Sequence, residues 1–308
     1  MKRSNLTLVS YSSSDEEDIA QEMPPKAPPM KKRKLPPLSS SIVTPGPVDN
    51  PALHQGRIRT TPHVDGQFAA HVYVSLPLGR HSLLYKVVQA ILCDAKEAIP
   101  TLHEIWTTEP VSQRPELHIS LSRPIFLRAH QREDLKRAVK NIAKAHKAFI
   151  VSFAILSELI NDEKTRTFLT MEVGAGHHEL RSLANSLAPA IEAVRQQAYY
   201  VKPRFHASIA WALPNNRPGT SGPLPVASDG TYGPCATEGI RVPPSNPNSP
   251  ITGTDVFPTI ACFPPEVITT LNERYGSELS SPKVGAFTVE SITLKIGKDM
   301  ISWNLTGM

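Results

Sequence analysis

The sequence has few cysteines and no long apolar segment, and both shortages limit what the protein can be. Its 3 cysteines are widely spaced and form no C-x-x-C pair. A disulfide framework or a structural zinc site is therefore not expected, and a reducing compartment fits the cysteine usage. No apolar run approaches the ~20 residues of a membrane-spanning helix, and the first residues lack the apolar core of a secretory signal. We therefore expect no membrane partner.

Low hydrophobicity and frequent proline indicate that part of the chain does not fold. Hydrophobic residues make up 40% of the 308 residues, and 30 residues are prolines, about twice the usual share of ~5%. Residues 1–66 are predicted to be a disordered tail with acidic, serine-rich and basic segments, because they bury too little apolar surface to offset chain entropy. Residues 67–308 are predicted to form the folded domain, with a mobile Pro/Gly/Ser-rich insertion at about 214–265.

The distribution of charge favours an anionic partner and a nuclear location. The formal net charge is +5, which favours nucleic acid weakly, since a basic tail alone can produce it. Lys31, Lys32, Arg33 and Lys34 form a tight cluster between prolines. This pattern resembles a nuclear localisation signal. A solvated charge run is the plainer interpretation, but the exposure and neutral flanks of the cluster favour the nucleus.

Hydrophobic periodicity predicts alternating strands and helices in the folded part. Strands are predicted at residues 68–78, 116–129, 149–160, 165–174, 204–213, 286–297 and 300–305. Helices are predicted at residues 81–99, 131–149, 177–197 and 265–279, the third interrupted by Pro189. This order predicts an α+β fold with antiparallel sheets flanked by helices.

Two of the predicted strands carry the same short motif. "ELHISLSRP" begins at Glu116 and "PRFHASIAW" at Pro203, and each holds His-x-Ser within an apolar frame. One such motif is expected by chance, but two copies in matching strands are less easily dismissed. One copy falls in each half of the folded part. The sequence therefore predicts two pseudo-symmetric lobes, each contributing one His-x-Ser strand to a central cleft.

The alternation of a strand divides each motif between two faces. Successive side chains point to opposite sides, so His118 and Ser120 share one face while Ile119 lies on the other. In the same way, His206 and Ser208 share a face. Each strand thus offers an apolar face to the core and a His/Ser face to the predicted cleft.

Three other interpretations of the paired motifs are weaker. A purely structural polar ladder accounts for the residues but not for their repetition. Zinc is not expected, because two histidines and two serines lack the third good ligand of a catalytic site. A Ser-His-Asp triad fits poorly, since no G-x-S-x-G elbow is present and the two side chains of one motif lie parallel.

Acid–base chemistry at a phosphate uses all four residues. An imidazole with a pKa near ~6.5 can accept or donate a proton at neutral pH. One histidine can take a proton from a nucleophile while the other gives one to the leaving oxygen, and the serine hydroxyls can hold the phosphate. RNA carries its own nucleophile, the 2′-hydroxyl. RNA cleavage with no metal or other cofactor is therefore predicted.

The motifs resemble those of the two-histidine phosphoesterase superfamily. Together with "EKTRTFLTMEVGAGH" and the serine-rich start "LVSYSSSDEED", they resemble the family of eukaryotic U6 small nuclear RNA 3′-end phosphodiesterases, and we expect a fungal member. The resemblance covers residues 67–212 well, the final strands less well, and the tail and insertion little. It implies a nuclear 3′-to-5′ exoribonuclease that trims the uridine-rich end of U6 RNA. It also implies a terminal 2′,3′-cyclic phosphate, which some fungal members open to a phosphate.

The resemblance also implies roles for individual residues. His118 and His206 match the catalytic histidines. We expect His118 to accept the proton and His206 to donate it, but the near-symmetric motifs do not fix this order. Ser120 and Ser208 match the serines that bind phosphate. Further substrate-binding candidates are Tyr200, which matches a base-stacking aromatic, Asp162, which would touch the same base, and Arg204, beside the second motif.

Two rival functions remain open from the sequence. The first is a 2′,3′-cyclic phosphodiesterase or ligase-like enzyme acting on small nucleotides. The second is a non-catalytic RNA-binding splicing factor, against which the intact His-x-Ser pairs count. Our prediction is a monomeric, metal-independent exonuclease whose partner is the 3′ end of U6 small nuclear RNA.

Overall fold

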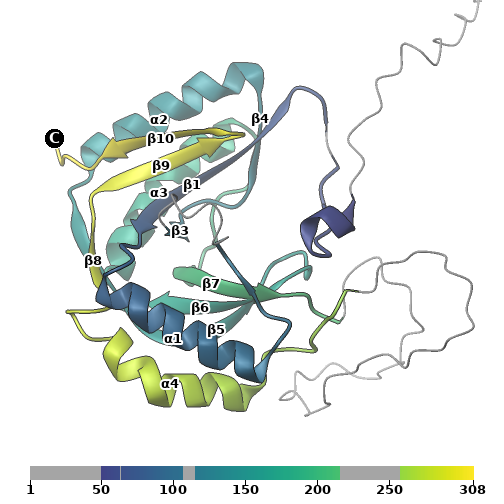
Figure 1. The fold of residues 1–308 in the computed structure, drawn as a ribbon. Coiled ribbons are helices and arrows are strands. Elements are labelled where there is room, and N and C mark those ends of the chain that lie inside the picture. Colours follow the sequence, from purple (N-terminus) through teal and green to yellow (C-terminus); the bar gives the residue numbers. More distant parts are fainter. Residues whose placement is uncertain (1–49, 63, 107–114, 216–256) are drawn as a thin grey trace, which may run out of the picture. The chain divides into compact units, whose positions relative to one another are not determined.

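The computed structural model describes residues 50–62, 64–106, 115–215 and 257–308 (Figure 1). Most of the predicted tail and insertion lies outside these residues. Inside their predicted bounds, the structure has a 3₁₀ helix at Pro51–His54 and a bridge between Pro214 and Ile260. Ordered structure therefore begins before residue 67 and extends into both ends of the segment predicted as an insertion.

A large antiparallel sheet dominates the described residues, as the predicted α+β fold requires. Its main path is β10-β9-β1-β3-β7-β6-β5-β8, with β2 beside β7 and β4 beside β1. The strands are β1 (Gln67–Pro77), β2 (His103–Glu104), β3 (Glu116–Ser120), β4 (Ile125–Arg128), β5 (Phe149–Ile160), β6 (Thr167–Val173), β7 (His206–Ala212), β8 (Ala286–Val289), β9 (Ser291–Ile296) and β10 (Asp299–Asn304).

The sheet divides into two lobes that meet at the His-x-Ser strands. The first lobe contains β1, β3, β4, β9 and β10, and the second contains β2, β5, β6, β7 and β8. Strands β3 and β7 pair antiparallel, with Ile119 opposite Ala207. The two lobes therefore share one continuous sheet, and each contributes one His-x-Ser strand to its centre.

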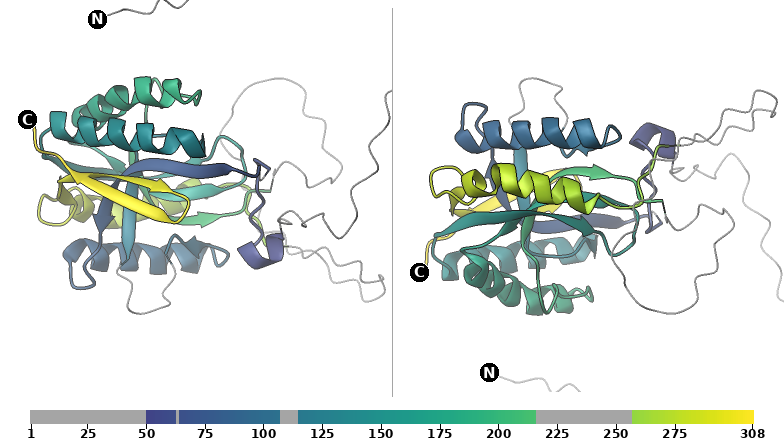
Figure 2. Two further views of the ribbon diagram at one scale, coloured as in Figure 1. Left: turned by 90° about the horizontal axis from the view of Figure 1, so that it is seen from above. Right: turned by 90° about the horizontal axis from the view of Figure 1, so that it is seen from below.

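Four helices cover the lobes in pairs. Helix α2 (Arg132–Ala145) packs on β9 and β10 and beside α3 (His177–Ala193), whereas α4 (Pro265–Leu279) packs on β5 and beside α1 (Leu83–Ala98). Figure 2 shows the two pairs on opposite sides of the strands. Helix α1 follows β1 in the chain but contacts β7. The chain thus crosses between the lobes, which ties them together.

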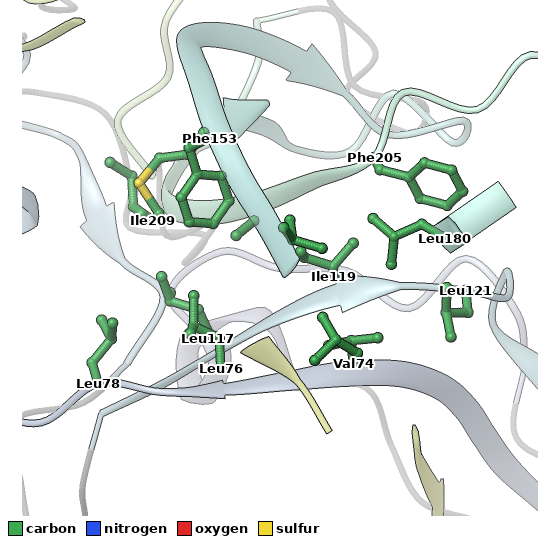
Figure 3. Packing of buried hydrophobic residues seen from close by; sticks show 14 of the residues in the cluster. Val74, Leu76, Leu78, Leu117, Ile119, Leu121, Phe153, Leu180, Phe205 and Ile209 are labelled. Atoms are coloured by element: carbon green, nitrogen blue, oxygen red, sulfur yellow. The ribbon is translucent and has the colours of Figure 1, made fainter. Parts of the chain in front are cut away.

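The apolar faces of the two His-x-Ser strands lie in the core. Leu117, Ile119 and Ile209 are fully buried and pack near Phe153 and Phe205 (Figure 3). Burying a side chain of this size stabilises the folded state by ~1.5–3 kcal/mol. The core thus orients both strands, and the His/Ser faces must point away from it.

Two predicted strands are each broken into two. The strand predicted at 116–129 ends at Ser120 and resumes at Ile125, after Pro124, which has no N–H for a sheet ladder. The strand predicted at 286–297 changes partners at Glu290. Before it, β8 pairs with β5, and after it, β9 pairs with β1, so the two halves belong to different lobes. Local periodicity does not record this change of partner.

Two smaller expectations were also wrong. Helix α3 continues through Pro189, because Leu187 and Ile191 on either side are fully buried and hold the helix in place. Cys93 is free and exposed, but Cys262 is disulfide-bonded.

We predict that Gly176→Ala destabilises the protein more than Gly66→Ala does. Both glycines have positive φ, +84° and +78°, so alanine costs ~1–2 kcal/mol at either position. A Cβ on Gly176 would lie 2.6 Å from the Ile150 carbonyl oxygen, whereas nothing lies within 4 Å of one on Gly66. Urea unfolding should give a free energy of unfolding lower by a further ~1–3 kcal/mol for Gly176→Ala. Equal losses would contradict the predicted clash.

Candidate active site

The four motif residues meet on one face of the sheet, each histidine beside the serine of the other motif. Directly opposite residues of antiparallel strands point the same way. With Ile119 opposite Ala207, His118 comes to lie opposite Ser208, and Ser120 opposite His206. All four side chains are partly exposed, while Ile119 and Ala207 are buried. The arrangement is a two-fold symmetric set of two imidazoles and two hydroxyls.

His206 is held by a bond to the segment that immediately precedes its strand. Its Nδ1 lies 2.6 Å from the carbonyl oxygen of Arg204 and, as the partner is an acceptor, donates to it. Burial lowers the pKa of His206, while the Arg204 carbonyl and the charge of Glu172 oppose the shift. The bond leaves Nε2 free to act on a substrate, and two groups favour the protonated ring.

His118 lies among different charged groups from His206. Burial lowers its pKa, the charge of His206 lowers it further, and Glu116 partly opposes both. The rings of His71 and Tyr73 lie edge-on to it, with centroids 5.4 and 5.5 Å away. His118 therefore favours the neutral state, as a proton acceptor must.

His71 is a site residue that the sequence reasoning missed. It lies on β1, and its Nε2 is 3.1 Å from the hydroxyl oxygen of Ser120. Burial lowers the pKa of His71 to about 4, with further contributions from His118 and Lys295. The ring is therefore neutral at neutral pH. The spacing of His71 and Tyr73 in "HVYV" indicates that both side chains lie on one face of a strand. Only the pairing of β1 with β3, however, brings His71 to Ser120.

Tyr200 and Asp162, predicted to touch the same base, contact each other. The Tyr200 hydroxyl donates to Asp162 Oδ2 at 2.8 Å, and burial followed by this bond raises the tyrosine pKa to about 12. Arg123, which was not predicted, lies 2.7 Å from the same carboxylate oxygen, and its guanidinium is 4.0 Å from the Tyr200 ring centroid. The ring is thus fixed, and 40% of the residue remains exposed.

Arg204 is engaged by a carboxylate. Its guanidinium forms an ion pair with Glu172 and lies 3.4 Å from the Ser157 hydroxyl. Burial raises the pKa of Glu172, but hydrogen bonds from Arg204 and Ser157 outweigh it and lower the pKa. Glu172 lies opposite His206 in the sheet. In this state Arg204 therefore neutralises the carboxylate beside a motif histidine.

Within residues 50–62, 64–106, 115–215 and 257–308, no group of three His, Cys, Asp or Glu side chains could hold a metal ion. In the same residues, no helix is long and apolar enough to cross a membrane.

The crosswise His-x-Ser pairs on neighbouring antiparallel strands are the arrangement expected from the resemblance to two-histidine phosphoesterases. A family model described as "HVSL: Uncharacterised conserved protein" matches residues 28–224. U6 snRNA phosphodiesterase 1 of Bos taurus is 31% identical over 231 residues, which cover 70% of this chain and 83% of that protein. The Neurospora crassa protein of the same name is 28% identical over 254 residues, 70% and 68% of the two chains.

The chain is also similar to solved structures. "Structure of Kluyveromyces marxianus Usb1" is 13% identical, covers 77% of this chain and 98% of that one, and has a TM-score of 0.45. On the family model and the sequence relatives, the chain belongs to the family of the U6 snRNA phosphodiesterases.

Proposed function

We propose that this protein trims the 3′ end of U6 small nuclear RNA as a 3′-to-5′ exoribonuclease. The crosswise placement of the two histidines and two serines is the observation on which the proposal rests. The printed name of the sequence relatives supports the substrate. The reaction is transesterification by the RNA itself, with no metal ion or other cofactor taking part.

In the proposed reaction, every atom and proton is supplied by the RNA and the two histidines. The 2′-hydroxyl of the penultimate ribose attacks the adjacent phosphorus, and His118 accepts its proton. The bond from phosphorus to the 5′-oxygen of the terminal nucleoside breaks, and Nε2 of protonated His206 donates a proton to that oxygen. The products are a shortened RNA with a 2′,3′-cyclic phosphate and a free nucleoside. A second step, with water as nucleophile, opens the cyclic phosphate to a terminal phosphate.

The division of roles follows from the electrostatic asymmetry of the two rings. The protonated form of His206 is favoured by the Arg204 carbonyl and by Glu172. His118 faces the charges of His206 and Lys295, with Glu116 as its opposing group. These surroundings support His118 as the base and His206 as the acid.

The remaining residues bind or position the substrate. Ser120 and Ser208 donate hydrogen bonds to the non-bridging oxygens of the phosphate. His71 is a positioning residue: when its Nε2–H donates to the Ser120 oxygen, the serine proton is directed at the phosphate. Tyr200 stacks on the terminal base, and Asp162 orients Tyr200. The guanidinium of Arg204 is already paired with a carboxylate, so Arg204 contributes least to RNA binding.

Nuclear location and a monomeric state complete the proposal. The basic cluster at residues 31–34, outside the described residues, supports entry into the nucleus, where U6 RNA is processed.

The proposed reaction predicts two separable results with a uridine-tailed RNA. Cleavage should proceed at full rate in EDTA, and a single 2′-deoxyribose at the penultimate position should block the first cleavage, because it removes the nucleophile. Product ends can be identified by mass spectrometry.

Loss of activity in EDTA that zinc or magnesium restores would exclude the mechanism. Trimming of the deoxy substrate at the normal rate would show attack by water. Preference for mononucleotide cyclic phosphates would favour the small-nucleotide rival.

Removing either histidine should lower turnover strongly without abolishing binding. A general acid or base contributes ~10²–10⁴-fold, so His118→Ala and His206→Ala should each lower kcat by at least ~100-fold. Ser120→Ala and Ser208→Ala should lower kcat more than RNA affinity, whereas Tyr200→Ala should mainly weaken affinity, since stacking is worth ~1–3 kcal/mol per base. His146→Ala, at a histidine that contacts Ser186, is the matched control. RNA binding with no cleavage by the unsubstituted protein would favour the non-catalytic rival.

The positioning role of His71 predicts rescue by a residue that keeps an N–H donor. His71→Ala should lower kcat and leave KM nearly unchanged, and His71→Gln should recover part of the loss. Steady-state kinetics on one RNA will test this. A structural role alone would instead lower the free energy of unfolding in both variants and give no recovery of kcat.

Burial lowers the pKa values of His118 and His206 below 6.5, so kcat/KM should peak on the acid side of neutrality. The base must be neutral, and the acid must be protonated. Glu172 raises the pKa of His206, so Glu172→Gln should lower it and move the alkaline limb of the pH–rate profile to lower pH. Arg204→Gln, which removes the opposing cation, should move that limb to higher pH. An alkaline limb that stays in place in both variants would contradict the assignment of His206 as the acid.

A further inference from the structure

Two arginines lie over two aromatic rings at the far end of the catalytic face. The guanidinium carbon of Arg57 is 5.3 Å from the Trp211 ring centroid. The guanidinium carbon of Arg166 is also 5.3 Å from a ring centroid, that of Phe168. Phe168 and Trp211 are directly opposite each other on β6 and β7. We call Arg57, Arg166, Phe168 and Trp211 the arginine–aromatic cluster.

The pairing of β6 with β7 places this cluster on the same face as the histidines. Glu172 and Thr170 pair with His206 and Ser208, and Phe168 pairs with Trp211. Alternate residues of β6 share a face, and so do residues directly opposite each other. An irregularity beside Leu169 and Thr170 supplies the extra residue in β7 that brings Trp211 to this face. Trp211 lies three residues beyond Ser208, a distance of about 10 Å along the strand.

The two arginines give the cluster a positive charge. Among the described residues, neither arginine forms an ion pair with a carboxylate, and the Arg57 side chain donates only to the His54 carbonyl oxygen. Burial lowers the pKa of Arg166, the charge of Arg57 lowers it further, and Glu163 partly opposes them. Two guanidinium groups that repel each other, one of them partly buried, are stabilised when an anion binds between them.

The surroundings hold Arg57 in this position. Gly56, the preceding residue, is buried with φ +78°, and a Cβ there would lie 2.6 Å from Leu213 Cδ1. The backbone of this segment therefore packs closely against the residue that follows β7. The ring of His103 stacks on Trp211 at 4.4 Å between centroids, and burial, followed by the charge of Arg57, lowers its pKa. His103 is thus favoured as a neutral ring, and the cationic groups remain the two arginines.

We infer that the arginine–aromatic cluster binds a backbone phosphate of the RNA upstream of the reacting phosphate. This inference rests on the proposed function, in which Tyr200 holds the terminal base and His118 and His206 act on the last phosphodiester. Arginine binds phosphate through paired N–H donors, and guanidinium groups beside aromatic rings are typical of single-strand RNA sites. The cluster thereby explains how a polymer end is selected over a small nucleotide.

The test compares a uridine-tailed oligonucleotide with the dinucleotide UpU, which has no upstream phosphate. In the full-length protein, Arg57→Gln and Arg166→Gln should each reduce the ratio of kcat/KM on the oligonucleotide to kcat/KM on UpU by roughly tenfold. The slope of log affinity against log salt for the oligonucleotide should become flatter by ~0.7 for each arginine removed. Arg57→Lys and Arg166→Lys should keep most of the salt slope, because the charge remains.

A matched control is available on helix α2. Arg137 is exposed and paired with Asp134 in the same helix, so Arg137→Gln should leave the ratio and the salt slope unchanged. An unchanged ratio in the Arg57 and Arg166 variants would overturn the inference. An equal loss of kcat/KM on both substrates would also overturn the inference, because it would show that the arginines act in folding or in the reaction itself. If the unsubstituted protein forms no cyclic phosphate from the oligonucleotide, the proposed function fails instead. Arg57 is exposed, so its variants remain informative if those of Arg166 do not fold.

Discussion

The pairing of β3 with β7 is the constraint on which the site depends. Ile119 and Ala207 are buried at this junction and stand opposite each other. This one register brings residues 88 positions apart in the sequence into a crosswise set of two histidines and two serines. A slip of one residue would turn either motif toward the core. The energy that holds the register comes from the apolar faces, so the packing of the core and the geometry of the site cannot be varied independently.

Burial has a second effect, on the protonation of the site. The sheet that orients His118, His206 and His71 also removes them from water, which lowers the pKa of all three. The site is symmetric in its residue types but not in its surroundings. Glu172 and the Arg204 carbonyl lie on the side of His206, whereas His71 and Lys295 lie on the side of His118. Neighbouring strands therefore separate the roles of two chemically identical groups.

Most individual elements could be predicted from local patterns. The bounds of β5 and α4 coincide with the predicted segments, because each has a sustained apolar period and polar or proline residues at its ends. The predictions failed where distant contacts outweigh local preference. Helix α3 passes Pro189 because the core holds both sides of it. The segment at 286–297 divides at Glu290 because its two halves pair with different lobes.

The sequence by itself determined the α+β class, the two His-x-Ser motifs and the faces on which their side chains lie. These features depend on the period of a strand, which is a local property of the chain. Tertiary structure alone decided that His71 contacts Ser120, that Arg123 contacts Tyr200 and Asp162, and that Arg57 and Arg166 lie over neighbouring rings. Each of these contacts joins residues from separate elements, and their positions follow from register and packing rather than from spacing.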